Sequence, residues 1–286
     1  MDISMEAVIE KSGTPVSLPH VYLEMNRLID LPDSTLADIA KVAEEDLGLT
    51  ARILKIVNSP YYGFPSTIDS ISRAVAILGT KDLRDLVLTT TTLDIFTKMK
   101  FKHDHIQEIL RHSLFCAVNA RLLAIELHQP QTECFFVAGL MHDIGRLILL
   151  QALPESSHMA ISEARTTGQD LDSIEQDIFG FTHSDIGNRL AELWHLPENV
   201  KEVIAFHHNP GRSRHFPLQT AVVHLADNRA NLIDKKSSLV SNPPPVKQEA
   251  LNVTSLSLER IDELLKTAPD HFKEVNQLFM NSDVAA

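Results

Sequence analysis

Residues 133–150 read ECFFVAGLMHDIGRLILL, an apolar run with His142 and Asp143 side by side in its middle. Its composition is that of a core helix, and we predict one helix from about Thr132 to Leu150. An imidazole and a carboxylate are costly to bury unless a partner compensates them. The rest of the chain must therefore supply a partner for this pair.

Composition narrows the class of protein. The chain has 286 residues, is 44% hydrophobic and only 6% aromatic, which favours an aliphatic helical core. A net charge of −12 argues against a nucleic-acid partner. No apolar run reaches membrane-span length and the N-terminus lacks a signal-peptide pattern, so we expect a cytoplasmic protein without a membrane partner. Cys116 and Cys134 are expected to be core thiols.

Apolar residues recur at helical spacing along most of the chain, and no segment shows convincing period-two alternation. We therefore predict an all-α fold. Thr35 with Asp38 reads as a capping box, and Thr50, Thr182 and Ser257 are further predicted helix caps. The main predicted helices span residues 68–78, 82–96, 103–127, 154–168, 171–179, 182–194, 197–207, 216–233, 258–265 and 271–280.

The composition changes after Asp234, where Lys, Ser and a Pro run at 243–245 indicate a linker. We divide the chain into an N-terminal helical part (1–97), a metal-binding helical part (98–234), and a linker with C-terminal helices (235–286). The boundary of the first two parts falls before the long helix predicted at 103–127.

Several predicted helices carry polar residues that could meet His142 and Asp143. Imidazole and carboxylate are ligands for Fe, Mn, Zn or Ni, and the absence of thiolate argues against a structural zinc cage. A carboxylate such as Asp143 can bridge two ions. The predicted metal ligands are Glu108, His112, His142, Asp143, His183, His207, His208 and Asp227.

Each member of this set also has a simpler interpretation. Glu108 and His112, four residues apart, could form a surface pair on one helix. Tandem histidines such as His207 and His208 are common at a solvated helix end. His142 and Asp143 could be hydrogen-bonded to caps and backbone without any metal.

Order and spacing match a known pattern. His112, then the pair at 142–143, then Asp227 on successive helices resemble the HD superfamily of metal-dependent phosphohydrolases. Glu108 and the further histidines at 183, 207 and 208 resemble its HD-GYP branch, as does the sequence HDIGR at 142–146. Residues 209–217 (NPGRSRHFP) lack the Gly-Tyr-Pro loop of that branch, which argues against cyclic-di-GMP as substrate.

The N-terminal half carries the more extended resemblance. LPDSTL at 31–36, LKIVNSPYYG at 54–63 and IDSISRAVAILG at 68–79 resemble the HDOD domain (HD-related output domain), over roughly residues 13–232. This resemblance implies a bacterial signalling protein with a helical N-terminal bundle before an HD-superfamily helical domain. Many members of that family lack the metal ligands, whereas this sequence keeps a complete set.

The resemblance implies a phosphohydrolase acting on a nucleotide, a cyclic nucleotide or another phosphorylated small molecule. It implies two or three divalent transition metals, with Fe as first choice and Mn, Ni or Zn as alternatives. Asp143 and Arg146 are the predicted catalytic residues, because Asp143 would bridge the ions and Arg146 would bind a phosphate oxygen. Asn209 and Arg212 are weaker candidates for the mouth of the site.

A second hypothesis is a regulatory binding module in which any metal is structural. Signalling proteins would then contact Tyr61, Tyr62 and Phe64, although packing of these aromatics on the metal-binding half is the simpler interpretation. A homodimer is a further expected assembly. A third hypothesis is a mixed-valent di-iron oxygenase, since the HD scaffold also hosts such centres.

Overall fold

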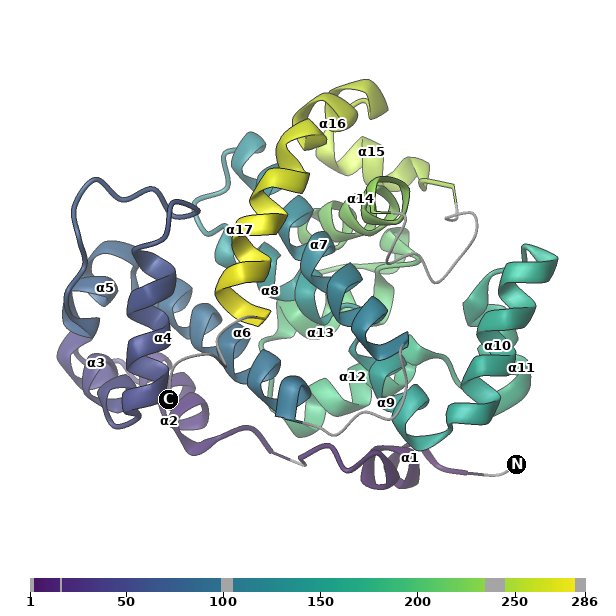
Figure 1. Cartoon of the computed structure of the whole chain (residues 1–286), viewed down its shortest axis with the longest axis horizontal. Coiled ribbons are helices and arrows are strands. Elements are labelled where there is room, and N and C mark those ends of the chain that lie inside the picture. The colour runs from purple at the N-terminus through teal and green to yellow at the C-terminus, as the bar shows by residue number, and fades with distance from the viewer. Residues whose placement is uncertain (1–2, 16, 99–104, 235–244, 281–286) are drawn as a thin grey trace.

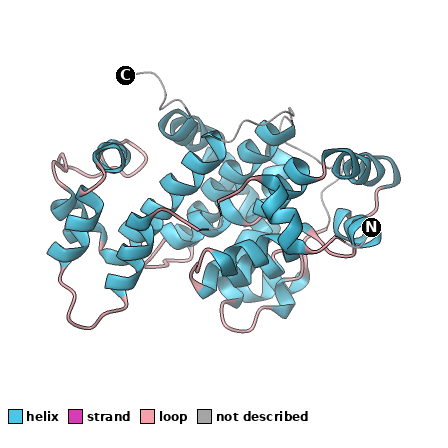
Figure 2. Cartoon of the chain, turned by 90° about the horizontal axis from the view of Figure 1, so that it is seen from below, coloured by secondary structure: helices cyan, strands magenta, loops and turns pink. Residues whose placement is uncertain are grey.

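The computed structural model describes residues 3–15, 17–98, 105–234 and 245–280. Every regular element in these ranges is a helix, so the all-α prediction is confirmed (Figure 2). None of the described helices is long and apolar enough to cross a membrane. The start predicted at 103 for the long helix and most of the predicted linker, 235–244, lie outside the described residues.

The first third of the chain forms a helical bundle, seen at the left of Figure 1, preceded by a separate short helix. The elements are α1 (Met5–Ser12), α2 (His20–Ile29), α3 (Leu36–Glu44), α4 (Leu47–Val57), α5 (Ile71–Leu78) and α6 (Thr80–Lys98). The rest of the chain supplies the larger helical body. Its elements are α7 (His105–Glu126), α8 (Glu133–Met141), α9 (Ile144–Ala152), α10 (Pro154–Thr167), α11 (Leu171–Phe179), α12 (His183–Leu193), α13 (Glu198–Phe206), the short 3₁₀ helix η1 (Pro210–Arg212), α14 (Pro217–Ile233), α15 (Gln248–Thr254), α16 (Leu258–Leu264), η2 (Leu265–Thr267) and α17 (Ala268–Met280).

Two of the three predicted threonine caps are confirmed, because Thr35 and Thr182 each form a reciprocal capping box. The start predicted at Thr50 is wrong. The carboxylate of Asp46 accepts the backbone N–H of Leu49 at 2.9 Å, so α4 already begins at Leu47. Thr50 lies inside the helix, and its hydroxyl donates to the carbonyl of Ala43.

The turn after α4 joins the bundle to the larger body. The hydroxyl of Tyr62 donates to Glu133 at 2.7 Å, and Arg121 donates to the other oxygen of the same carboxylate at 2.9 Å. The guanidinium of Arg121 also lies 4.5 Å from the centre of the Tyr61 ring. Tyr61 is only 8% exposed, so this ring packs against the body and offers little surface to a partner.

The helix predicted over residues 132–150 is in fact two helices that meet at the His-Asp pair. Helix α8 ends at Met141 and α9 begins at Ile144. Asp143 lies between them with φ −102° and ψ 17°, outside the α-helical region. The prediction of one continuous helix was wrong because apolar periodicity persists across the junction while the backbone direction changes.

Two glycines flank this junction and bring it against different helices. A methyl group added at Gly139 would lie 2.9 Å from the Cα atom of Ala117, so α8 approaches the backbone of α7 closely there. A methyl group at Gly145 would overlap the backbone carbonyl oxygen of His183, so α9 lies directly on the start of α12. The junction is thus placed between α7 on one side and α12 on the other.

Helix α1 packs on α9 and α12 of the larger body, away from the bundle that follows it in sequence (Figure 1). Val8 and Ile9 are buried, and the indole N–H of Trp194 donates to the carbonyl of Pro15 at 2.8 Å. The boundary drawn at residue 97 stays a prediction, but this packing places residues from before it in the core of the larger body.

The C-terminal helices pack back on the body. Ser257 caps α16 as predicted, whereas α15 was not predicted and α17 begins at Ala268, three residues before the predicted start. Helix α17 lies across α7 and α6, where the ring of Phe272 is 4.9 Å from that of Phe115.

Candidate metal centre

The first group of potential ligands gathers on α7, α14 and the α8–α9 junction. Nε2 of His112 lies 2.9 Å from Oδ1 of Asp227, and Nε2 of His142 lies 3.7 Å from the same oxygen. All three side chains are buried or nearly so. Their ligand atoms lie within 4.8 Å of one another, a spacing at which one ion could bind all three. We call these residues the inner group.

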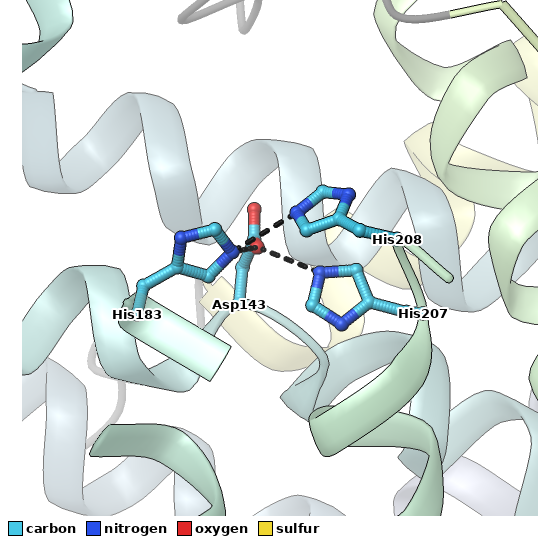
Figure 3. A group of neighbouring side chains, drawn as sticks. All are labelled: Asp143, His183, His207 and His208. Atoms are coloured by element: carbon cyan, nitrogen blue, oxygen red, sulfur yellow. Dashed lines mark hydrogen bonds and ion pairs between the residues drawn. The ribbon is translucent and has the colours of Figure 1, made fainter. Parts of the chain in front are cut away.

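A second group adjoins the first, and we call it the outer group. It consists of Asp143, His183 at the start of α12, and His207 and His208 after α13. Figure 3 shows His183 on one side of the Asp143 carboxylate and the tandem histidines on the other. Nε2 of His183 lies 3.4 Å from Oδ1 of Asp143 and 3.0 Å from Nε2 of His208, and Nε2 of His207 lies 3.5 Å from the same Asp143 oxygen.

Asp143 stands between the two groups and turns one oxygen toward each. Its Oδ1 faces the outer histidines, while its Oδ2 lies 3.4 Å from Nε2 of His142 and 3.9 Å from Nε2 of His112. This arrangement arises at the break between α8 and α9. A carboxylate so placed has the orientation needed to bridge two ions.

Three of the histidines are oriented by acceptors behind their rings. Nδ1 of His142 donates to the carbonyl of Gly139 at 2.7 Å, and Nδ1 of His207 donates to that of Ile204 at 3.0 Å. Nδ1 of His183 donates to Glu175 at 2.7 Å. These bonds fix the proton on Nδ1, so Nε2 of each ring points into the centre, as in proteins that bind metals through histidine.

Charge within the centre favours cations. Burial opposes ionisation of Asp143, but Arg146 and His142 hold the pKa of its carboxyl well below the usual value. Burial likewise opposes ionisation of Asp227, yet hydrogen bonds from His112 and His142 keep its pKa well below the usual value. Both carboxylates are therefore ionised at neutral pH.

The protonation of His142 differs from that of the tandem histidines His207 and His208. Burial disfavours a charged His142, but the neighbouring Asp143 outweighs burial and the pKa of His142 lies well above its usual value. Burial lowers the pKa of His207. Burial, together with the neighbouring rings of His207 and His183, holds the pKa of His208 well below its usual value. Metal binding would thus have to displace a proton from His142 but not from the tandem pair.

Unsatisfied polar atoms also indicate that the two groups suit metal ions. Nε2 of His142, Nε2 of His207 and Oδ1 of Asp143 have no hydrogen-bond partner within the described part of the chain, although all three side chains are at most 1% exposed. Leaving such atoms buried and unpaired costs about 1–3 kcal/mol each. One ion in each group would satisfy these atoms, so the two groups fit divalent transition metals.

Glu108 is the one predicted ligand that lies apart from both groups. Its carboxylate is 4.0 Å from the guanidinium of Arg165 on α10, and its side chain is 35% exposed. The other seven predicted ligands are gathered in the inner and outer groups. Their roles as ligands remain predictions, whereas their proximity is a feature of the fold.

Arg146 extends from the first turn of α9 into the centre. Its Nη1 lies 2.9 Å from Oδ2 of Asp143, and its Nη2 lies 3.5 Å from Nε2 of His208. A cavity of about 360 Å³ opens in front of it, and residues of both groups reach its wall. The cavity lining includes Arg146, Arg165, Asp172, His208, Asp227 and Lys247.

A second cavity, of about 540 Å³, shares Asp172, His208 and Asn209 with the first. Arg212 lines this second cavity and lies 5.1 Å from the ring centre of Phe206. Asn209 and Arg212, the weaker candidates for the mouth of the site, are therefore at its rim.

Sequence reasoning missed Asp172 and Glu175 of α11, which form a third close group with His183. One signal was available. Glu175 lies on the apolar face of its helix with Leu171 and Ile174, where a carboxylate is costly to bury without a partner. That partner is His183, whose backbone N–H and Nδ1 both donate to Glu175.

An all-helical body with a buried histidine–aspartate centre defines a protein of the HD type. Residues 16–210 match the HDOD domain, and the chain belongs to the HDOD family. It is 27% identical over 263 residues to an uncharacterized protein of Treponema pallidum (strain Nichols), covering 88% of this chain and 50% of that protein. The chain thus spans about half the length of this relative.

Solved structures share the fold. An HDOD domain protein from Geobacter sulfurreducens aligns with a TM-score of 0.74 and 24% identity, covering 97% of this chain and 100% of that one. A Marinobacter aquaeolei VT8 protein named as a candidate signal transduction protein aligns with a TM-score of 0.72 and 20% identity, covering 97% of this chain and 62% of that one. A Shewanella amazonensis SB2B protein named as a candidate metal-dependent phosphohydrolase aligns with a TM-score of 0.64 and 20% identity. The alignment covers 96% of this chain and 97% of that one.

Proposed function

We propose that this HDOD protein is a metal-dependent phosphohydrolase acting on a nucleotide, a cyclic nucleotide or another small phosphorylated molecule. The observation that carries the proposal is the position of Asp143, with one oxygen toward each of two buried ligand groups and Arg146 beside it at the wall of a cavity. The name of the Shewanella amazonensis protein of similar fold supports the same reaction class.

Access to the centre favours catalysis over a purely structural metal. Structural metal sites are closed by protein ligands, whereas catalytic sites keep a position open to substrate. Here His208 and Asp227, one from each group, line the cavity of about 360 Å³. That volume lies in the range of about 300–1,000 Å³ typical of small-molecule sites.

The cations around this cavity suit a phosphorylated ligand. Arg146, Arg165 and Lys247 all contribute to its wall. A guanidinium can bind two phosphate oxygens at once, so Arg146 is placed to hold a phosphoryl group next to Asp143. Arg165 and Lys247 would attract the rest of an anionic substrate.

The inner group would hold one ion, the outer group the other, and Asp143 would contact both. Divalent metals so bound supply Lewis-acid polarisation of a phosphoryl group and lower the pKa of water. The chain itself orients the histidines through Glu175 and backbone carbonyls, and Arg146 positions both the carboxylate and the substrate. Fe²⁺ is our first choice of metal and Mn²⁺ the most practical alternative, because imidazole and carboxylate ligands suit both.

Turnover assays with defined metals test the proposal. Purified chain is stripped of metal, loaded with Fe²⁺ under reducing conditions or with Mn²⁺, and mixed with aryl phosphate mono- and diesters, nucleotides and cyclic nucleotides. We expect metal-dependent release of phosphate or of the alcohol product, and at least a 100-fold loss in Asp143→Ala. Glu163→Gln is the matched control, because Glu163 is an exposed residue of α10, and this variant should retain wild-type activity. Two bound ions with no release from any compound would reject the proposal.

The regulatory alternative also has a supporting observation, the shared fold of the Marinobacter aquaeolei protein named for signal transduction. In that case the metal would stabilise a binding module without turnover. The alternative predicts that Asp143→Ala leaves the capture of a signalling partner intact, whereas the phosphohydrolase proposal predicts the loss of product release.

A further inference from the structure

Helix α11 turns two carboxylates toward the outer group that are not among the ligands considered so far. One of them, Glu175, is hydrogen-bonded to His183. A single oxygen of Glu175 accepts both the ring Nδ1–H and the backbone N–H of His183, each at 2.7 Å. Its side chain is 5% exposed. Glu175 therefore orients His183 from behind and faces away from the position of an ion.

The other carboxylate, Asp172, lies at the open side of the outer group. Its Oδ1 is 3.5 Å from Nε2 of His208, the ring atom that points into the centre. Its side chain is 27% exposed and lies on the wall shared by the two cavities. Asp172 thus borders both the tandem histidines and the route by which small molecules reach them.

The atoms near Asp172 are arranged for a cation. Nδ1 of His183 is 3.4 Å from Asp172, but its proton is donated to Glu175. Nε2 of His183 and Nε2 of His208 face each other at 3.0 Å. Only one proton can lie between two facing imidazole nitrogens, whereas one divalent ion can bind both nitrogens and the neighbouring carboxylate.

We propose that Asp172 is an additional ligand of the outer metal ion, together with Asp143, His183, His207 and His208. The inference rests on the proposed metal centre but not on phosphohydrolase activity. A second carboxylate makes the outer site harder and more negative, which favours Mn²⁺ or Fe²⁺ over softer ions. It also links helix α11, and with it one wall of both cavities, to occupation of the outer site.

Metal binding measured without any substrate tests this role. Wild type, Asp172→Asn, Glu175→Gln and Asp177→Asn are stripped and titrated with Mn²⁺ and Co²⁺, and bound metal per chain is measured by elemental analysis. The visible spectrum of bound Co²⁺ reports coordination at each added equivalent. Asp177 is the matched control, because it is an exposed aspartate on the same helix. Circular dichroism of the metal-free forms checks that each variant is folded.

We expect Asp172→Asn to keep one tightly bound ion and to bind the second at least tenfold more weakly, with an altered Co²⁺ spectrum for that second ion. Glu175→Gln should weaken binding by about 10–100-fold without changing the spectrum, as expected of a residue that only orients a ligand. Wild-type affinity and spectrum in Asp172→Asn, or an equal loss in Asp177→Asn, would overturn the inference. A wild-type chain that binds no second ion would overturn both it and the proposed metal centre, whereas normal binding without turnover would reject only the phosphohydrolase.

Discussion

At the scale of single residues, Gly145 has the strictest steric requirement of the centre. A Cβ atom at this position would overlap the carbonyl oxygen of His183 and lie 2.8 Å from the backbone nitrogen of Gly187. Both obstacles are backbone, which cannot rotate away. Asp143 lies two residues before Gly145 in the sequence, and the carbonyl that Gly145 meets belongs to His183. This close contact therefore holds Asp143 and His183 within reach of each other.

We therefore predict that Gly145→Ala lowers the free energy of unfolding by about 3 kcal/mol, because the helices must separate to admit the methyl group. The second metal ion should bind more weakly in the same variant, since its proposed ligands include Asp143, just before α9, and His183, at the start of α12. Urea unfolding and metal titration measure the two effects. Gly48→Ala is the control, because its new methyl group meets only the Asp46 side chain, at 3.3 Å, and should change stability by about 1 kcal/mol or less.

A second prediction for a single residue concerns Glu202 on α13. Its carboxylate accepts hydrogen bonds from the segment between η1 and α14. Burial alone would raise its pKa, but the hydroxyl of Ser213 and the backbone N–H groups of residues 214–216 lower it to about 2, from a usual 4.5. Because the folded-state pKa is lowered, the ionised carboxylate contributes stability that is fully present above pH 4.5 and is lost as the pH falls toward 2.

Glu202→Gln should therefore cost about 1–3 kcal/mol at pH 7, the cost of weakening hydrogen bonds to a charged acceptor, and progressively less between pH 4.5 and 2. Urea unfolding of metal-free wild type and variant across this range gives the difference. Glu198→Gln, whose side chain is 75% exposed, should show almost no difference at any pH. A wild-type-minus-variant difference that does not change with pH would contradict the assignment.

At the scale of helices, the sequence predicted best where a cap or a proline marks an end. Thr35, Thr182 and Ser257 begin helices as predicted, because each supplies a side-chain acceptor to the first turn. The break at the His-Asp pair was missed, because no proline or cap marks it and apolar residues continue through it. Contacts with α7 and α12 decide the break, and those helices are distant in sequence.

The burial of helix α1 against the larger body can be tested by mutation. Its amphipathic pattern fixes which face is buried but not which partner buries it, and the structure packs it on α9 and α12. Ile9 is 2% exposed, so Ile9→Ala should destabilise the protein by about 2–5 kcal/mol. Ile77→Ala, at a position 44% exposed, should cost less than about 1 kcal/mol. Urea unfolding compares the two, and equal costs would show that α1 is detached in solution.

At the scale of the whole molecule, the centre joins segments that are more than 100 residues apart in sequence. His112 on α7 and Asp227 on α14 are held together by one 2.9 Å contact. The common centre of the predicted ligands was indicated by the chemistry of their side chains and by their order along the chain, which resembles that of the HD superfamily. Spacing could not predict that Glu108 pairs with Arg165, nor that Asp172 borders the centre, because both depend on where α10 and α11 pack.

Because the proposed ligands come from several helices, metal occupancy should govern global stability. An ion that binds only the folded state at a free concentration of 1,000 times its dissociation constant adds about 4 kcal/mol. We expect Mn²⁺ to raise the Tm of the stripped protein by several degrees and chelation to reverse the rise. Asp143→Asn should lose most of this shift, while Asp177→Asn should retain it. Differential scanning calorimetry measures the shift, and an unchanged Tm at saturating metal would contradict the expectation.

The packing of α1 also has a consequence for how the chain can be divided. In three dimensions α1 lies with α9 and α12, although α2 to α6 stand between α1 and the rest of the larger body in the sequence. A fragment cut before α7 would lack Val8 and Ile9 of its own core. Shuffling or excision of the N-terminal bundle should therefore keep residues 3–15 with the larger body and reconnect them to it.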